Sequence, residues 1–230
     1  MLDINKHRHI LFELIRTIYS SPLSGLLGFK GGTMAYFFYG LDRFSVDLDF
    51  DLLDGSQKDK TRSLMADIIK NYGTVKENTD KRFTIFFLLN YGPGNRNIKI
   101  EINKRNLSDS GFIISSFYGT DVKIQKIEDA FATKLLACTT RKRVAYRDFY
   151  DVYFYLKKGI IPNEKIIKKV SHKNTAVYLK GLIKFINEKV TTRSVLHGVG
   201  ELIDTGQKDF IKRRFKDELL AELNFIRSKF

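Results

Sequence analysis

Three aspartates alternate with apolar residues in S-V-D-L-D-F-D-L, residues 45–52. Successive side chains of an extended strand point to opposite faces, so the pattern predicts a strand with one buried face. The carboxylates of Asp47, Asp49 and Asp51 then share the other face. Carboxylates held that close repel each other unless a cation lies between them. Such oxygen ligands suit Mg²⁺, which proteins often bind through one or two carboxylates together with substrate phosphates. Asp51 lies nearer the strand end and is interpreted as a bystander.

A glycine pair precedes the acidic strand in the sequence Gly31-Gly32-Thr33. It lies between a predicted short strand, residues 26–29, and a predicted helix, residues 33–39. Glycines let a backbone approach a phosphate closely, and a helix start offers free N–H groups. Thr33 could add a hydroxyl donor to the same phosphate. Tight turns use glycine pairs as often, and the acidic strand that follows is what favours phosphate binding.

Two nucleotide-binding candidates lie between the predicted helix and the acidic pair. Arg43 could hold a carboxylate or a phosphate oxygen, or it could be a surface turn residue. Ser45 directly precedes the strand, and we group both residues with the nucleotide-binding candidates.

A third carboxylate lies on a later predicted strand, N-I-K-I-E-I-N, residues 97–103. This strand pairs in a predicted hairpin with residues 83–90. If it packs beside the acidic strand, Glu101 reaches the face of Asp47 and Asp49. Three carboxylates could then hold two metal ions, which activate an attacking hydroxyl and stabilise a leaving pyrophosphate. The alternative is a solvent-facing glutamate on an amphipathic strand.

Further charged candidates lie between residues 126 and 158. Lys134 lies among apolar residues of a predicted helix, so it is expected to be partly enclosed and able to neutralise triphosphate charge. Arg143, Arg147 and Asp151 are spaced four apart and are expected on one face of a predicted helix over about 144–157, with Asp148 beside them. The alternative is a set of surface pairs, each contributing about 0.2–0.5 kcal/mol.

The composition sets limits on the class of protein. The chain has 230 residues, 43% of them hydrophobic, and a formal net charge of +14. Its one cysteine, Cys138, excludes an internal disulfide framework and is expected to be a packed thiol in a reducing cytosol. Residues 1–8 show no signal-peptide pattern and no apolar run approaches the ~20 residues of a membrane span. These features predict a cytoplasmic protein without a membrane partner. His7 and His9 are interpreted as part of a solvated N-terminal stretch.

Charge and periodicity both change near residue 126. Residues 1–125 carry 17 Lys and Arg against 14 Asp and Glu, a net charge of +3, whereas residues 126–230 carry 23 against 12, a net charge of +11. We therefore expect an α+β catalytic domain over 1–125 and a basic, all-helical domain over 126–230 that binds a polyanion. The alternative is a solvated basic surface. Predicted helices are 4–19, 56–72, 128–138, 144–157, 163–171, 175–189, 194–203 and 207–228, with two further strands at 112–117 and 122–125.

Three ordered motifs resemble a known family. K-G-G-T at 30–33, R-F-S-V-D-L-D-F at 43–50 and Y-R-D-F-Y-D-V at 146–152 resemble the AbiEii/AbiGii-type nucleotidyltransferases. These are toxin components of bacterial abortive-infection toxin–antitoxin systems. The glycine pair with Asp47-x-Asp49 also matches the defining motif of the DNA polymerase β-like nucleotidyltransferase superfamily. The resemblance covers about residues 25–155.

The resemblance implies a fold, an activity and roles for several residues. It implies a polymerase-β-like nucleotidyltransferase domain that uses Mg²⁺ (or Mn²⁺) to transfer a nucleotide from an NTP to an acceptor. In some relatives the acceptor is the 3′ end of tRNA, and a cognate antitoxin protein is an implied partner. Asp47 and Asp49 match the metal-binding pair, and Lys134 matches a nucleotide-contacting lysine that Arg147 could assist. Asp148 matches a later active-site acid, and the choice between it and Asp151 stays open.

Two other functions remain as alternatives. One is nucleotidylation of a protein or a small molecule, and the net charge of +11 on residues 126–230 argues against the small molecule. The other is a nucleic-acid-binding module of the same fold without turnover, against which the intact aspartate pair argues.

Overall fold

The computed structural model describes residues 3–105, 110–141 and 143–230. The chain forms two compact units. The sheet unit comprises the residues up to Gly40 together with Phe44–Lys126, and the helical unit comprises Leu41–Arg43 together with Ile127–Phe230. The chain therefore enters the helical unit for three residues long before the main crossing at residue 126. The expected boundary between residues 125 and 126 did not include this short excursion.

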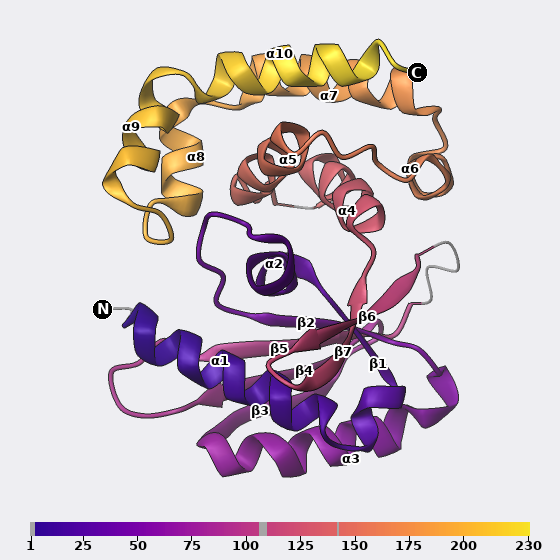
Figure 1. Cartoon of the computed structure of the whole chain (residues 1–230), viewed down its shortest axis with the longest axis vertical. Helices are drawn as coiled ribbons and strands as arrows, with labels where there is room; N and C mark the ends of the chain where they lie inside the picture. The colour runs from indigo at the N-terminus through magenta and orange to yellow at the C-terminus, as the bar shows by residue number, and fades with distance from the viewer. Residues whose placement is uncertain (1–2, 106–109, 142) are drawn as a thin grey trace. The chain divides into compact units, whose positions relative to one another are not determined.

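Seven strands in the described part of the sheet unit form one mixed sheet, in the order β3-β4-β5-β2-β1-β7-β6 (Figure 1). The acidic strand, β2, lies in the middle of this sheet, antiparallel to β1 and parallel to β5. The strand bounds are β1 Leu27–Lys30, β2 Leu48–Leu52, β3 Thr74–Asp80, β4 Thr84–Asn90, β5 Ile98–Asn103, β6 Phe112–Phe117 and β7 Thr120–Gln125.

One face of the sheet is apolar and carries two helices, α1 (Ile4–Tyr19) and α3 (Lys58–Ile69), as Figure 1 shows. The rings of Tyr19 in α1 and Phe50 in β2 lie 6.5 Å apart, which places α1 on the face opposite the carboxylates. The expected burial of Val46, Leu48 and Phe50 is confirmed. Helix α1 has the bounds that the sequence predicted, and α3 is shorter than predicted because single 3₁₀ turns flank it at 55–57 and 70–72.

Strand β3 was missed by the sequence analysis. Its sequence, T-V-K-E-N-T-D, has a single aliphatic residue, Val75, and its residues are exposed or half-buried. It is an edge strand paired only with β4, so neither face requires an apolar stripe. A lysine on such an edge also discourages pairing with another chain.

The glycine pair opens helix α2 (Gly31–Met34), which continues as a π-helical turn over Ala35–Tyr39. Gly40 ends this turn in a left-handed conformation, with φ of 74°. The predicted helix at 33–39 therefore exists and begins two residues earlier, so that both glycines belong to its first turn.

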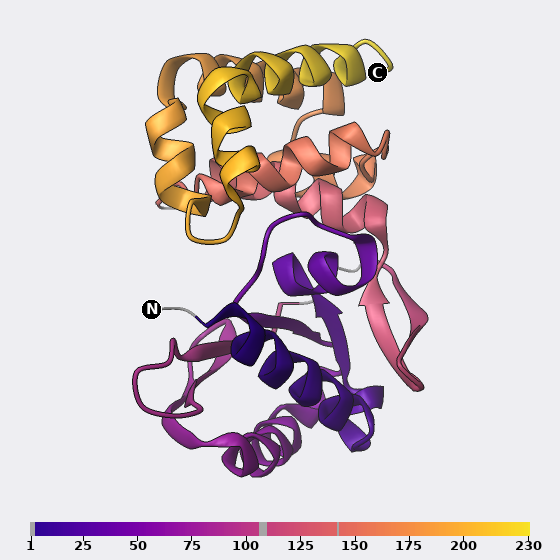
Figure 2. The ribbon, with the colours of Figure 1, turned by 60° about the vertical axis from the view of Figure 1, so that its left-hand side comes forward.

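The helical unit consists of helices that pack around buried aromatic side chains such as Phe149 and Phe215. Helices α7 and α10 run side by side in both views (Figures 1 and 2). The bounds are α4 Ile127–Thr140, α5 Arg147–Lys157, α6 Glu164–Ser171, α7 Thr175–Lys189, α8 Thr192–Val199, α9 Thr205–Arg213 and α10 Phe215–Arg227. No helix in the described residues is both long and apolar enough to cross a membrane.

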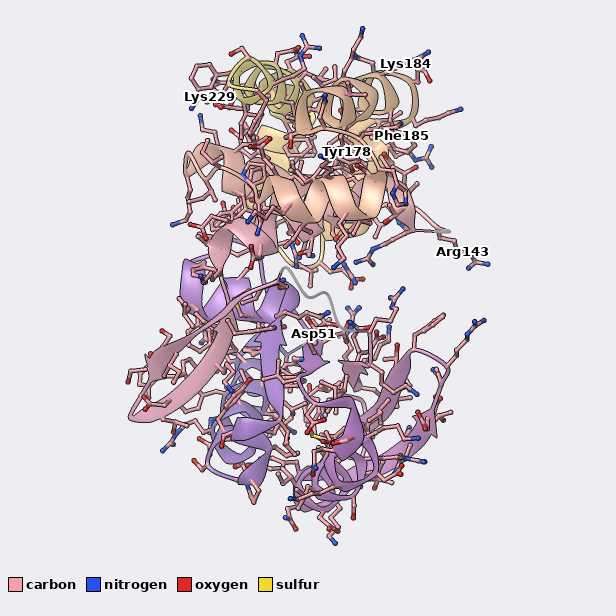
Figure 3. The ribbon with its side chains drawn as sticks, turned by 90° about the vertical axis from the view of Figure 1, so that its right-hand side faces the viewer. Asp51, Arg143, Tyr178, Lys184, Phe185 and Lys229 are labelled. Carbon is pink, nitrogen blue, oxygen red and sulfur yellow. The ribbon has the colours of Figure 1, made fainter. Side chains whose placement is uncertain are left out.

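Two predictions about these helices were wrong. The helix predicted over 207–228 is two helices, because Arg214 leaves the helical conformation with φ of −136° between α9 and α10. Helix α5 begins at Arg147, so Arg143 lies ahead of it and does not share a helical face with Arg147 and Asp151. Figure 3 shows the Arg143 side chain directed away from the helices. The buried Cys138 thiol, in contrast, was predicted correctly.

The excursion of residues 41–43 ends in a buried ion pair. Arg43 donates from Nη2 to Asp151 Oδ2 at 2.7 Å and from Nε to Asp151 Oδ1 at 2.5 Å. Both side chains are almost fully buried, and Lys134 Nζ lies 2.8 Å from Asp151 Oδ2. A planar guanidinium and a carboxylate match each other in such a fork. The pair fixes the short segment to helix α5.

We expect Asp151→Asn to destabilise the protein by about 3–5 kcal/mol, because Arg43 would keep a buried charge without its counter-charge. The measurement is the free energy of unfolding in urea, followed by circular dichroism. The matched control is Asp209→Asn, which removes an exposed ion pair with Lys212 and should cost less than about 1 kcal/mol. Equal losses in the two variants would contradict a structural role for the Arg43–Asp151 pair.

The same pair makes stability depend on acid pH. Burial alone would raise the pKa of Asp151, but Arg43 and Lys134 more than offset it and lower that pKa to about 2. An unfolded aspartate titrates near ~3.9. The pKa of Asp151 is lower in the folded than in the unfolded protein. Its ionised form therefore stabilises the fold above pH ~4, and this stabilisation is lost as the pH falls towards 2. We expect the stability difference between wild type and Asp151→Asn to shrink by about 2–3 kcal/mol over that window. A constant difference would argue against the pairing.

Candidate active site

The centre of the sheet brings the predicted carboxylates to one face. Asp49 in β2 and Glu101 in β5 are direct partners in the parallel register, so their side chains lie on the same face. Asp47 directly precedes β2, and its Oδ1 accepts a hydrogen bond from the main-chain N–H of Lys99 at 3.4 Å. Asp47 and Asp49 are half-buried and Glu101 is exposed. The condition on which the sequence argument for Glu101 depended, that its strand pairs with the acidic strand, is met.

The glycine turn packs against this face. Gly31 has φ of +82°, and a Cβ added to it would lie 2.4 Å from Asp49 Oδ2. Both the conformation and the lack of space therefore require glycine at this position. Bare backbone at the start of α2 lies directly beside a carboxylate, which is the arrangement that a metal-bound phosphate needs.

Thr33 does not have the role that the sequence suggested. The residue is fully buried, and its hydroxyl donates to the main-chain oxygen of Asp47. The same hydroxyl lies 3.0 Å from Ser45 Oγ. Thr33 therefore fixes the chain that carries the carboxylates, and its hydroxyl is not directed at a phosphate.

Asp51 is held by partners of its own at the end of β2 (Figure 3). It forms an ion pair with Lys30, and its Oδ1 accepts a hydrogen bond from Asn103 Nδ2 at 2.7 Å. Lys30 caps the start of α2, directly before Gly31. Lys30 opens the K-G-G-T motif, but the sequence analysis gave it no role, although a lysine next to a glycine pair is a recognisable signal for phosphate binding.

His7 was assigned wrongly to a solvated stretch, whereas His9 is exposed. His7 is fully buried, with Nε2 2.9 Å from the main-chain oxygen of Val46 and Nδ1 2.7 Å from the hydroxyl of Tyr91. Burial lowers the pKa of this imidazole, although the hydrogen bond to Val46 and the charge of Asp47 oppose the shift. The charged neighbours Lys6 and Arg8 had suggested that His7 is exposed to solvent.

The helical unit holds a second group of predicted residues. Lys134 Nζ lies 3.1 Å from Asp148 Oδ1 and 2.8 Å from Asp151 Oδ2. Arg141 Nε lies 3.1 Å from Asp148 Oδ2. Burial favours a lower pKa for Lys134, but the two carboxylates more than offset it and raise the pKa, so the lysine is a cation. Lys134 is enclosed as expected, and Asp148 and Asp151 are both fully buried.

Two arginines among the predicted residues differ in position. Of the two roles that the sequence left open for Arg43, holding a carboxylate is the one found, because its fork is paired with Asp151. Arg147 is half-buried at the first residue of α5. Arg43 and Arg147 belong to the helical unit together with Lys134, Asp148 and Asp151, and the sheet unit carries Gly31, Gly32, Thr33, Ser45, Asp47, Asp49 and Glu101.

The acidic face fits a divalent cation by the chemistry of its donors. Asp47, Asp49 and Glu101 offer only carboxylate oxygens, the ligands that Mg²⁺ prefers. Across residues 3–105, 110–141 and 143–230, no three His, Cys, Asp or Glu residues converge closely enough to hold a metal unaided. An aspartate pair that is completed by substrate phosphates agrees with both observations.

Comparison with solved structures supports the fold. JHP933 from Helicobacter pylori has a TM-score of 0.66 at 22% identity, covering 100% of this chain and 94% of its own. A second H. pylori structure, described as a candidate nucleotidyltransferase, has a TM-score of 0.67 at 22% identity and covers 98% and 95%. An antigenic nucleotidyltransferase-like protein from Paracoccidioides brasiliensis has a TM-score of 0.53 at 14% identity and covers 90% and 97%. The expected α+β architecture followed by helices is confirmed.

Comparison with known sequences identifies the family. No curated protein matches the chain. The family described as "Nucleotidyl transferase AbiEii toxin, Type IV TA system" matches residues 13–226, nearly the whole chain. This match agrees with the motifs at the glycine turn, at the acidic strand and at the start of α5. The chain therefore belongs to the AbiEii family of nucleotidyltransferase toxins from type IV toxin–antitoxin systems.

Proposed function

We propose that this toxin transfers a nucleotide from an NTP to an RNA acceptor, in particular the 3′ end of tRNA, with Mg²⁺ (or Mn²⁺) bound by Asp47 and Asp49. Glu101 is the proposed third metal ligand. The observation that carries this proposal is the register that places Glu101 beside Asp49, next to a glycine turn that leaves no room for a side chain. Both NTP and tRNA are cytoplasmic, which is where we propose that the toxin acts.

The reaction is an in-line displacement. The acceptor hydroxyl loses its proton to water and its oxygen attacks the α-phosphorus of the NTP. The bond from that phosphorus to the bridging oxygen breaks, and pyrophosphate leaves with the bridging oxygen. The metal, when bound, supplies charge neutralisation of the phosphates and activation of the hydroxyl. The chain contributes backbone N–H groups at Gly31 and Gly32 and the ammonium of Lys30, which Asp51 holds beside the turn.

Charge supports a polyanionic acceptor. The net charge of +11 on residues 126–230 favours RNA over an uncharged small molecule. Helix α7 illustrates how this charge is displayed, since Lys184 points outward and Tyr178 points into the unit in Figure 3. The side chain of Lys184 is 78% exposed. Lys134 and Arg147 are the residues we propose to balance triphosphate charge. Asp148, paired with Lys134 and Arg141, and Asp151, paired with Arg43 and Lys134, are the two candidates for the later acid.

The family also implies a protein partner. A toxin of a toxin–antitoxin system has a cognate antitoxin.

The first test removes the proposed metal ligands. Wild type, incubated with Mg²⁺, total RNA and each labelled NTP in turn, should label RNA. The Asp47→Ala, Asp49→Ala double variant should lose activity by about 10³-fold or more, because several kcal/mol of transition-state stabilisation depend on the metal. Asp59→Ala, which removes an exposed carboxylate from α3, is the matched control and should stay active. Labelling of protein in place of RNA would show that the acceptor is a protein. No labelling at all would refute the proposed nucleotide transfer.

The second test concerns the glycine turn. Gly31→Ala places a methyl group against Asp49 Oδ2 and strains a residue with φ of +82°, which costs about 1–3 kcal/mol. We expect nucleotide transfer to fall by at least tenfold. Gly25→Ala is the control, because a Cβ there meets no atom within 4 Å. Similar activity in the two variants would show that the Gly31 turn is not part of the site.

A further inference from the structure

Asp47 lies where the sheet itself does not fix the main chain. Strand β2 begins at Leu48, and its pairing with β5 begins with Leu48 and Ile100. Its pairing with β1 reaches only Asp49, which is opposite Lys30. Asp47 therefore precedes the first ladder pairs, so other groups have to hold its backbone for the carboxylate to keep a fixed position.

Two side chains from distant parts of the sheet unit hold it. The hydroxyl of Thr33 donates to the main-chain oxygen of Asp47, and Nε2 of His7 lies 2.9 Å from the main-chain oxygen of Val46. These oxygens belong to the peptide groups on either side of the Asp47 Cα. Fixing both peptide planes fixes the direction in which the Asp47 side chain leaves the backbone.

The hydrogen bonds of His7 determine its tautomer. The Val46 oxygen can only accept, so Nε2 carries the hydrogen and donates it. In the neutral ring Nδ1 then accepts from the Tyr91 hydroxyl at 2.7 Å. The ring also packs edge-on against Phe44 and Tyr91, at centroid distances of 5.8 and 5.3 Å. A ring held on both nitrogens and on its edges has one orientation.

We propose that His7 is a positioning residue for Asp47: its Nε2–H, oriented by Tyr91, holds the peptide group ahead of the metal-binding carboxylate. The inference rests on the proposed function in that Asp47 is taken as a metal ligand. His7 lies before residues 13–226, which match the family, so the family motifs do not include it.

The test measures metal binding without turnover. The readout is the dissociation constant of Mn²⁺, followed by electron paramagnetic resonance of the full chain with a non-hydrolysable NTP analogue. His7→Leu removes the donor and should weaken Mn²⁺ binding about tenfold, the effect of losing one buried hydrogen-bond partner. His7→Gln keeps an N–H donor at comparable reach and should stay within about threefold of wild type. Tyr91→Phe leaves the His7 ring without its second hydrogen bond, and its dissociation constant for Mn²⁺ should lie between those of His7→Gln and His7→Leu.

The matched control is Tyr72→Phe. The hydroxyl of Tyr72 lies 2.5 Å from Thr17 Oγ1, so it contacts helix α1 near the end that is farther from His7 in the sequence. We expect this variant to lower the melting temperature without changing Mn²⁺ affinity. If His7→Leu changes Mn²⁺ affinity no more than Tyr72→Phe does, the positioning role is refuted. If His7→Leu does not fold, equal affinity of His7→Gln, Tyr91→Phe and wild type refutes it.

The outcome is separable from the proposed reaction. Weakened Mn²⁺ binding in His7→Leu supports the positioning role even where wild type transfers no nucleotide. Active wild type with unchanged Mn²⁺ affinity in the His7 variants overturns the positioning role and leaves the reaction standing. Wild type that binds Mn²⁺ no better than Asp47→Ala overturns the metal role of Asp47 and the inference with it.

Discussion

Repulsion between carboxylates on one strand face is the constraint around which the sheet unit is arranged. Asp47, directly before β2, alternates with Asp49 and Asp51 within it, and Glu101 joins their face from β5. Lys30 and Asn103 stabilise Asp51, at the end of β2 farthest from Asp47. The remaining carboxylates lie beside a turn of bare backbone, in a place where a cation with its phosphates would relieve the repulsion. On the proposed function, the like charges that oppose each other on this face without a cation are what would bind one.

In the helical unit, buried carboxylates are paired with cationic side chains. Among its described residues, Asp148 and Asp151 are fully buried and are opposed by Arg43, Lys134 and Arg141. Such a cluster favours one arrangement of its members, because moving any one of them away leaves its partner as a buried charge without a counter-charge. Arg43 links this cluster to the acidic strand along the chain, because only three residues separate it from Asp47. Arg43 is the first residue of the motif that contains the acidic strand, yet its contacts place it in the helical unit.

The alternation of residues 45–52 was sufficient to predict β2, its buried face and its acidic face, because a half-buried central strand has to alternate. Strand β3 could not be predicted in this way, since an edge strand has no such requirement. The break at Arg214 has no Gly or Pro to mark it, and the buried Phe215 follows it directly. His7 did leave a signal: together with Leu11, Leu14 and Ile18 it follows the helical spacing of the buried face of α1. The charges beside it concealed that signal.

The motif itself divides into residues that can touch a substrate and residues that cannot. Thr33 belongs to the sequence signature as firmly as Gly31 does, yet its hydroxyl is buried against the backbone of Asp47. A sequence pattern records which residue types are needed at which spacing, and it does not distinguish an atom that binds a phosphate from one that fixes the chain. Positioning residues outside the pattern leave even less trace, because their partners are main-chain oxygens that every residue type offers. His7 is of this kind, and only the geometry around Val46 relates it to the acidic strand.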